Sequence, residues 1–169
     1  MRIRYRAILF IFLCGLTSFA QVATPHASGG NEKVKTVTLH AKGPFDVKLA
    51  PQASPELPQG ALSRMSIDKQ YHGELEGTSK GEMLIGGTDV KGSAGYVAME
   101  QVTGKLNGRS GSFILQHSAT MNRGVPQLSI TVVPDSGSDQ LIGLTGSMNI
   151  IITDGKHTYD FEYTLPEAH

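Results

Sequence analysis

The chain has 169 residues, and its 15 lysine and arginine residues balance 15 aspartate and glutamate residues, giving a formal net charge of zero. This balance argues against an electrostatic nucleic-acid binder, which needs a basic patch or stripe. The length suits one ordinary domain with a core large enough to fold without disulfides or metals.

The first 20 residues predict a secretory signal peptide. Three arginines lie within the first six residues, an apolar run follows over residues 7–16, and small residues lead up to Ala20. The run is shorter than the roughly 20 residues of a membrane-spanning helix, which argues against an uncleaved anchor. Cys14 follows Leu13 rather than the small residue that lipidation requires. We therefore expect export to the periplasm or the medium, with no stable membrane anchor after cleavage.

Cleavage after Ala20 changes the chemistry of the chain. It removes Cys14, the only cysteine, so the mature protein has no disulfide and no thiolate chemistry. It also removes three of the fifteen basic residues, leaving twelve against fifteen acidic ones, a net charge of −3. Residues 21–33 are polar with glycine and serine, which predicts a flexible linker ahead of a domain over residues 34–169.

From Val34 onward the chain predicts strands and shows no helical period. Gly43-Pro44 is expected to interrupt the first strand, and residues 51–60 predict a proline-rich loop. A strong turn signal stands at Pro134–Gly137. About eight strands are expected, over residues 34–49, 65–71, 82–85, 96–102, 113–117, 127–133, 148–153 and 157–165.

The clearest local feature is a hairpin. Two alternating runs flank Gly104–Gly108 within residues 93–117. Residues 73–79 and 104–110 share the pattern Gly-x-Leu-x-Gly-x-Ser, which suggests a second glycine hairpin upstream. Recurrent hairpins with glycine corners are typical of a small antiparallel barrel.

Strand alternation assigns polar side chains to otherwise apolar faces. One face of the last strand carries His157 and Tyr159, and one face of residues 96–102 carries Glu100. His117 shares a face with Phe113 and Leu115. If these faces all point into one barrel, a carboxylate and two imidazoles line its interior. Barrels of about eight strands either fill this space with side chains or hold one small ligand.

The chain resembles a bacterial family, the domain of unknown function 3224. The resemblance rests on residues 95–117, above all Gly104…Gly108-Arg109…Gly111-Ser-Phe…Gln116-His117, and on residues 132–146. It spans residues 37–165. Members are described as resembling the allene oxide cyclase barrel, so it implies a single closed, calycin-like antiparallel barrel with a central cavity. It implies no activity, because no residue here matches a catalytic position of the plant cyclase.

Three charged or titratable side chains each have two interpretations. Glu100 is a buried general base with a raised pKa, or a carboxylate at the barrel mouth paired with Arg109 or a lysine. His117 orients a ligand, or is a core histidine that bonds a backbone carbonyl. Arg109 clamps a carboxylate, or is a solvated turn residue. The full set of candidate ligand-binding residues is Tyr96, Glu100, Arg109, Phe113, Leu115, His117, His157 and Tyr159. Glu100 and His117 are expected on adjacent strands, both turned inward.

No metal or cofactor is predicted. The histidines show no i, i+2 pair and no carboxylate companion at metal-ligand spacing. The chain has no phosphate loop and no dinucleotide fingerprint.

Three functions remain open at this point. The favoured one is an exported barrel that binds a small, largely apolar ligand in its cavity. The alternatives are a cofactor-free isomerase or cyclase acting on a hydrophobic substrate, and a filled structural barrel acting through its surface in oligomers. Binding is favoured because the sequence offers no assembled acid–base pair. The identity of the ligand, the pathway and the oligomeric state do not follow from the sequence.

Overall fold

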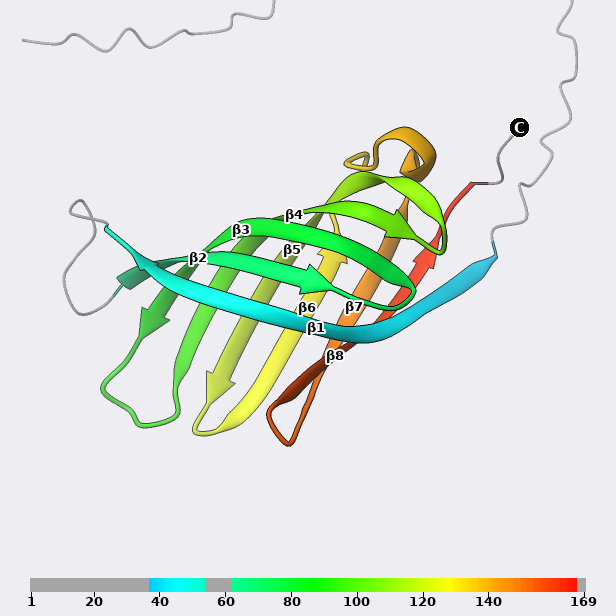
Figure 1. Cartoon of the computed structure of the whole chain (residues 1–169). Helices are drawn as coiled ribbons and strands as arrows, with labels where there is room; N and C mark the ends of the chain where they lie inside the picture. Colours follow the sequence, from blue (N-terminus) through cyan, green and yellow to red (C-terminus); the bar gives the residue numbers. More distant parts are fainter. Residues whose placement is uncertain (1–36, 54–61, 167–169) are drawn as a thin grey trace, which may run out of the picture. The chain divides into compact units, whose positions relative to one another are not determined.

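The computed structural model describes residues 37–53 and 62–166, which form one closed barrel of antiparallel strands in chain order (Figure 1). The strands are β1 (Thr38–Gln52), β2 (Leu62–Tyr71), β3 (Leu75–Gly87), β4 (Ala94–Leu106), β5 (Arg109–Asn122), β6 (Val125–Val132), β7 (Thr145–Thr153) and β8 (Lys156–Thr164). A single 3-10 turn, η1 (Asp139–Leu141), lies between β6 and β7. The predicted all-β class and eight-strand antiparallel barrel are confirmed.

Several predicted segments lie outside the described residues. They are the signal peptide over residues 1–20, the linker over residues 21–33 and most of the proline-rich loop. Within residues 37–53 and 62–166, no helix has the length and apolarity needed to cross a membrane.

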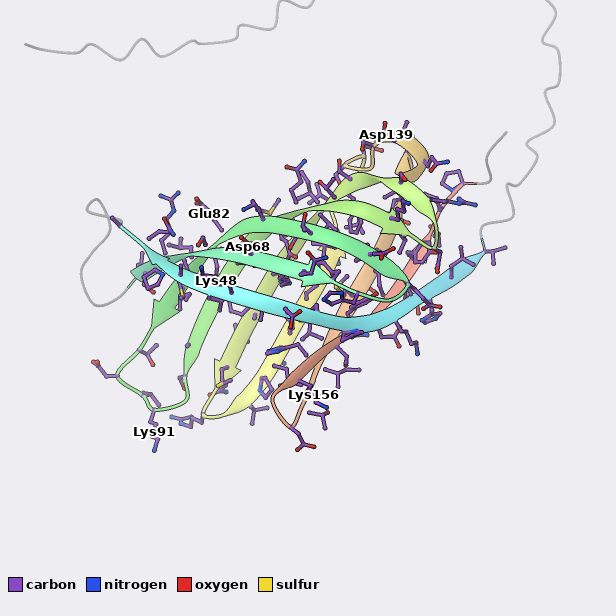
Figure 2. All side chains as sticks on the ribbon, viewed as in Figure 1. Lys48, Asp68, Glu82, Lys91, Asp139 and Lys156 are labelled. Carbon is purple, nitrogen blue, oxygen red and sulfur yellow. The ribbon has the colours of Figure 1, made fainter. Side chains whose placement is uncertain are left out.

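The strands alternate inward and outward side chains, as the sequence pattern predicts. Along β5, Phe113, Leu115 and His117 are buried while Gln116 is exposed. The charged side chains of Lys48, Asp68 and Glu82 project from the outside of the barrel (Figure 2). The alternation thus separates an apolar interior from a charged exterior.

The two ends of the barrel are built differently (Figure 1). At one end lie the β2–β3 and β4–β5 turns and the β6–β7 connection over residues 133–144. That connection inserts Leu141 and Leu144, both fully buried, into the main apolar core. Its Ser136 and Ser138 hydroxyls accept hydrogen bonds from β5 amides at 3.0 and 2.9 Å. We call this the plugged end. The far end carries the β3–β4, β5–β6 and β7–β8 connections.

Two predicted boundaries need correction. Gly43-Pro44 does not interrupt β1, which is continuous and pairs with β8 up to Pro44 and with β2 from Phe45. Glycine is needed at position 43 because a Cβ there would collide with the backbone oxygen of His72 and crowd the Tyr159 hydroxyl. The glycine at position 43 therefore permits close contact with a neighbouring segment and does not end the strand.

The upstream glycine repeat contains the predicted hairpin only at its start: Gly73, with a φ of 90°, lies in the turn between β2 and β3, whereas Gly77 lies within β3. β3 begins at Leu75, and Gly77 lies directly opposite Gly104 of β4. A Cβ on either glycine would collide with the backbone of the other strand. The repeated motif therefore marks a place where two strands approach closely, because neither position has a side chain.

The predicted β4–β5 hairpin is confirmed and is tighter than the glycine spacing indicates. Leu106 and Arg109 are paired, so only Asn107 and Gly108 form the turn. Both have positive φ, 47° and 81°. Two central residues with positive φ define the type I′ turn, whose twist matches that of antiparallel strands.

Replacing Gly108 with valine should destabilise the barrel through the backbone alone. A Cβ at this position meets no atom within 4 Å, so the cost comes from its φ of +81°. We expect Gly108→Val to lower the free energy of unfolding by about 1–3 kcal/mol. Gly87→Val is the matched control, because Gly87 also has open space but lacks a positive φ. Equal melting temperatures for the two variants would contradict this assignment.

Candidate functional site

A layer of buried polar side chains crosses the barrel between two apolar clusters. The larger cluster fills the plugged end, and a smaller one contains Ile67, Met83 and Ala98. On the inward face of β4, Glu100 stands between Ala98 and Val102, which belong to different clusters. Lys69 stands likewise between Ile67 and Tyr71 on β2. The polar layer therefore divides the interior in two.

Glu100 is the centre of this layer and is fully buried. Its Oε1 accepts hydrogen bonds from the Tyr71 hydroxyl at 2.7 Å and the Ser79 hydroxyl at 2.5 Å. Its Oε2 accepts one from Lys69 Nζ at 2.7 Å. Gly81 lies opposite Glu100 on β3, and a Cβ there would collide with the β4 backbone. A buried carboxylate is tolerated only when paired and hydrogen-bonded, and both conditions are met here.

Lys69 neutralises the charge of Glu100. The lysine is 6% exposed, and its Nζ also donates to the Tyr71 hydroxyl at 3.2 Å. The ammonium lies 5.1 Å from the centre of the Phe45 ring, within the range of a cation–π contact. The layer therefore has no net charge from this pair, and it offers an incoming molecule no unbalanced ion.

His117 is the member of the layer with unused hydrogen-bonding capacity. Its side chain is buried, and its Nε2 lies 3.0 Å from Glu100 Oε2. The two groups are too poorly aligned for a hydrogen bond, so Nε2 is a buried polar atom without a partner among the described residues. A carboxylate oxygen so near favours the tautomer with a hydrogen on Nε2, directed toward Glu100.

The pKa of Glu100 moves in the opposite direction from the one predicted. Burial by itself would raise this pKa, but the neighbouring His117 imidazole, the Lys69 ammonium and the Ser79 hydroxyl outweigh burial and lower it to about 2. Burial, reinforced by the Glu100 charge, raises the pKa of Tyr71, so its hydroxyl remains a donor. Glu100 is therefore an ionised structural anchor rather than the general base with a raised pKa.

The structure brings together two of the predicted residues. Glu100 and His117 lie on adjacent strands, both facing inward, as expected. Glu100 is paired with a lysine, but deep inside the barrel rather than at its mouth. Arg109 flanks the β4–β5 turn at the plugged end, and its predicted pairing with Glu100 is not present.

The other predicted residues have different surroundings. Phe113, Leu115 and Tyr159 belong to the main core, and the Tyr159 hydroxyl is bonded to the β2–β3 turn, 2.8 Å from Leu75 N. Tyr96 is half-buried against the smaller cluster. His157 is half-buried, with its ring centre 5.3 Å from that of Phe45.

Sequence reasoning missed three members of the layer: Lys69, Tyr71 and Ser79. A signal for the first two was present in the alternation of residues 65–71, which assigns Lys69 and Tyr71 to the same face as Ile67. A lysine on an apolar face is the anomaly that marks a buried ion pair. Ser79 ends the Gly-x-Leu-x-Gly-x-Ser repeat, but that pattern did not indicate burial, because a small hydroxyl is common on either face of a strand.

Inward-facing side chains at the far end are mostly apolar, with Ser63 and His157 as polar exceptions, and many remain accessible. Leu49, Met121, Leu128 and Ile152 are 46%, 43%, 42% and 63% exposed, although each has the parity of the buried residues on its strand. Val47, Met65, Ile85, Tyr96 and Ile150 pack partly buried against the two clusters. The far end is therefore an accessible apolar lining on one side of the polar layer.

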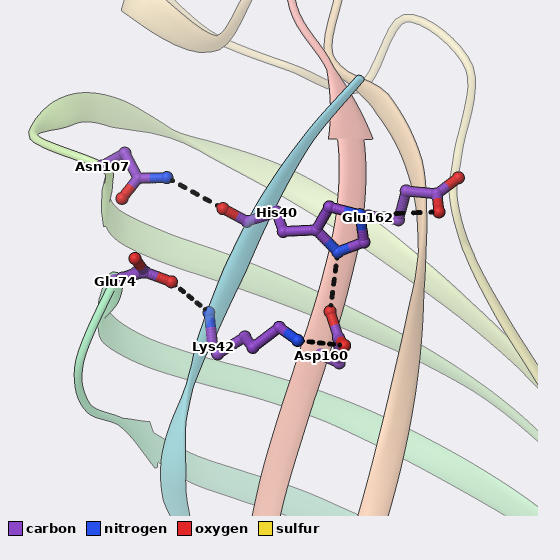
Figure 3. A network of polar contacts seen from close by, with 6 residues as sticks. All are labelled: His40, Lys42, Glu74, Asn107, Asp160 and Glu162. Carbon is purple, nitrogen blue, oxygen red and sulfur yellow. Dashed lines mark hydrogen bonds and ion pairs between the residues drawn. The ribbon is translucent and has the colours of Figure 1, made fainter.

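A second polar network lies on the outside of the plugged end (Figure 3). Asp160 on β8 is bonded to His40 Nδ1 at 3.0 Å and to Lys42 Nζ at 2.9 Å. Two turn residues extend this network. The Glu74 carboxylate, in the β2–β3 turn, accepts a hydrogen bond from Lys42 N. The Asn107 amide, in the β4–β5 turn, donates one to His40 O. Asp160 is partly exposed and the other side chains are exposed, so the network contributes little to the stability of β1 and is not a candidate site.

Comparison with known proteins places this geometry in a family. A family model described as "Protein of unknown function (DUF3224)" matches residues 41–163. The chain belongs to the DUF3224 family. A solved structure of a DUF3224 protein of unknown function from Shewanella oneidensis MR-1 is 48% identical, with a TM-score of 0.72. The alignment covers 79% of this chain and 100% of that chain. No curated protein matches. Membership is confirmed, whereas the likeness to allene oxide cyclase stays a prediction.

The DUF3224 polar layer should make the barrel sensitive to acid. The pKa of Glu100 falls from 4.5 to about 2 on folding, so its contribution to stability is complete above pH 4.5 and is lost as the pH falls through 2. In urea unfolding at pH 6 and pH 3, the wild type should lose more stability than Glu100→Gln. The comparison variant is Asp160→Asn, because His40 and Lys42 lower the pKa of this partly exposed carboxyl too. Water screens that site, so the effect should be smaller. Parallel pH profiles for wild type and Glu100→Gln would contradict the assignment.

Proposed function

We propose that this DUF3224 protein is exported and binds a small, largely apolar molecule among the inward-facing side chains of the far end. The observation that carries the proposal is the accessible apolar lining beside a buried polar layer. Inward-facing residues of a filled barrel are buried, as Ala41, Tyr71 and Phe161 are at 0% exposure near the plugged end. Leu49, Met121, Leu128 and Ile152 depart from that rule together. A concave apolar site with a few polar groups is the usual form of a small-molecule site.

The polar layer supplies one group to orient such a molecule. Every oxygen of Glu100 already accepts a hydrogen bond, and Lys69 is held between Glu100 and Tyr71. His117 Nε2 is buried, its one polar contact, with Glu100, is poorly aligned for a hydrogen bond, and it belongs to the layer that borders the apolar lining. A ligand oxygen near His117 would satisfy this nitrogen, and the neutral ion pair beside it favours an uncharged ligand.

The enzyme alternative has less support. Proton abstraction in an isomerase needs a base whose pKa lies near the working pH. Glu100 has a pKa of about 2 and is surrounded by donors. The third alternative, a filled structural barrel, agrees with the buried side chains of the plugged end. It does not explain why inward-facing apolar side chains at the far end are accessible. Binding is the function that uses both the lining and His117.

Mass spectrometry of small molecules released from the native protein tests the proposal. We expect an apolar compound to co-purify with the wild type and to be depleted in Leu128→Lys, which places a charge on the lining. Val97→Lys is the matched control, because Val97 is 55% exposed on the outer face of β4. His117→Ala should weaken the affinity about tenfold, the effect of losing one buried hydrogen bond, without unfolding the barrel. Equal loss of ligand in both lysine variants, or unchanged retention in all of them, would refute this location.

Export has a separate test. The arginines and apolar run of residues 1–16 and the small residues before Ala20 support cleavage at that point. Protein recovered from the periplasm or the medium should begin near Gln21 when its terminus is sequenced. An intact Met1 on protein purified from cells would contradict export by this route.

A further inference from the structure

The strand pair β6–β7 differs from every other neighbouring pair in the described barrel. Adjacent strands elsewhere share between seven and thirteen directly opposed residue pairs. β6 and β7 share one, Thr131 with Ser147, next to the plugged end. Beyond it, residues 125–129 are all exposed, and so are residues 151–153. We call the boundary between β6 and β7 the seam. Its strands are paired at Thr131 and Ser147 and are unpaired from there toward the far end.

The two strands nevertheless match as partners. Extending the antiparallel register from Thr131 and Ser147 sets Val125 opposite Thr153, which are the first residue of β6 and the last of β7. In this register Leu128 faces Ile150 and Ile130 faces Met148, so inward residues oppose inward residues, as they must in a barrel. Six further pairs would form without any shift. This agreement in strand ends and in the direction of the side chains is expected of two strands that pair with one another.

Composition sets these strands apart as well. Of the eight strands in the described residues, β6 and β7 alone have no Asp, Glu, Lys, Arg or His, while each of the other six has at least two. Permanently open sheet edges usually carry charges or other devices that prevent pairing. Apart from Pro126 on β6, the two strands carry no such device, which indicates edges that spend part of their time paired and covered.

The seam also leads to the proposed ligand lining. Leu128 on β6 and Ile152 on β7 are inward-facing, accessible members of that lining and stand on its two sides. Val125 and Ile151 add exposed apolar surface at 66% and 50%. An apolar molecule that passed between the strands would meet no charged side chain of either strand and would reach the lining directly.

We propose that the β6–β7 seam is the lateral portal of the ligand site: it opens to admit an uncharged apolar molecule and closes by pairing residues 125–130 with 148–153. The inference rests on the proposed binding function. It adds the route of entry and the element that moves. Thr131 and Ser147 act as the hinge, and the buried β6–β7 connection holds the plugged end still.

A reversible cross-link tests closure and entry together. Ser129 and Asn149 oppose one another in the extended register, and both are exposed. A disulfide needs Cα atoms about 4.4–6.8 Å apart, a separation that paired strands provide, so a Ser129→Cys, Asn149→Cys bridge reports closure. The matched control joins Ser118→Cys to the same Ser129→Cys across the paired β5–β6 ladder. The sole native cysteine, Cys14, lies in the predicted signal peptide and is replaced by serine in both variants.

The readout is stopped-flow fluorescence with the neutral apolar dye N-phenyl-1-naphthylamine. We expect the β6–β7 bridge to form, to slow dye association by about tenfold or more, and to release the block on reduction, as expected for a locked gate. The β5–β6 control bridge should leave the rate unchanged.

Each other outcome is decisive. A β6–β7 bridge that fails to form while the control forms would contradict closure. An unchanged association rate in the bridged variant would contradict the portal. A bridge that forms between two chains, seen as a covalent dimer on a non-reducing gel, would show that the edges pair between copies instead. Absence of dye binding to the wild type would overturn the proposed binding function, and with it the portal, while the cross-linking result would still report whether the seam closes.

Discussion

The buried carboxylate of Glu100 is the constraint around which the interior is arranged. It accepts hydrogen bonds from Tyr71 and Lys69 on β2 and from Ser79 on β3, and it approaches His117 on β5. One side chain thereby links four consecutive strands. An ion that is removed from water at this depth is stable only if every partner is in place, so the layer fixes the register of those strands.

The same layer explains why the two halves of the barrel differ. On its plugged side, aromatic rings and the two leucines of the β6–β7 connection fill the space, with Phe113 and Phe161 stacked at 5.7 Å. On its other side, the lining is apolar but accessible. The polar layer prevents the larger cluster from continuing through the barrel, because its charged groups require one another rather than hydrocarbon neighbours. The fold is thus stabilised from one end, and the apolar side chains of the other end stay accessible.

This division also relates the proposed site to the seam. Strands β1 to β5 and the β7–β8 hairpin are held by long ladders, and the polar layer ties β2, β3, β4 and β5 together. β6 and β7 lie outside the layer and carry no charge, so little opposes their separation toward the far end. Mobility at a binding site is expected where buried contacts and ladder hydrogen bonds are fewest. A rigid polar layer and a weakly paired β6–β7 seam are consistent with the proposed binding and release of a small molecule.

The sequence by itself determined the class of fold and the facing of most side chains. Alternation with period two is a local property, so it correctly predicted about eight strands and the inward direction of Glu100 and His117, while the glycine hairpins and the family resemblance predicted the closed barrel. The hairpin around Gly104–Gly108 was predicted from its flanking alternation and glycines, but its narrowing to the two-residue Asn107–Gly108 turn was not.

Only the tertiary structure decided what these groups do. Whether a glycine breaks a strand or permits close contact depends on the neighbour it meets, and so Gly43 and Gly77 were misassigned. The sign of the Glu100 pKa shift depends on Lys69 and Ser79, which are 31 and 21 residues away in the chain and come into contact only through the sheet. The partial β6–β7 pairing is likewise invisible in either strand alone, because a ladder is a relation between two strands and not a property of one.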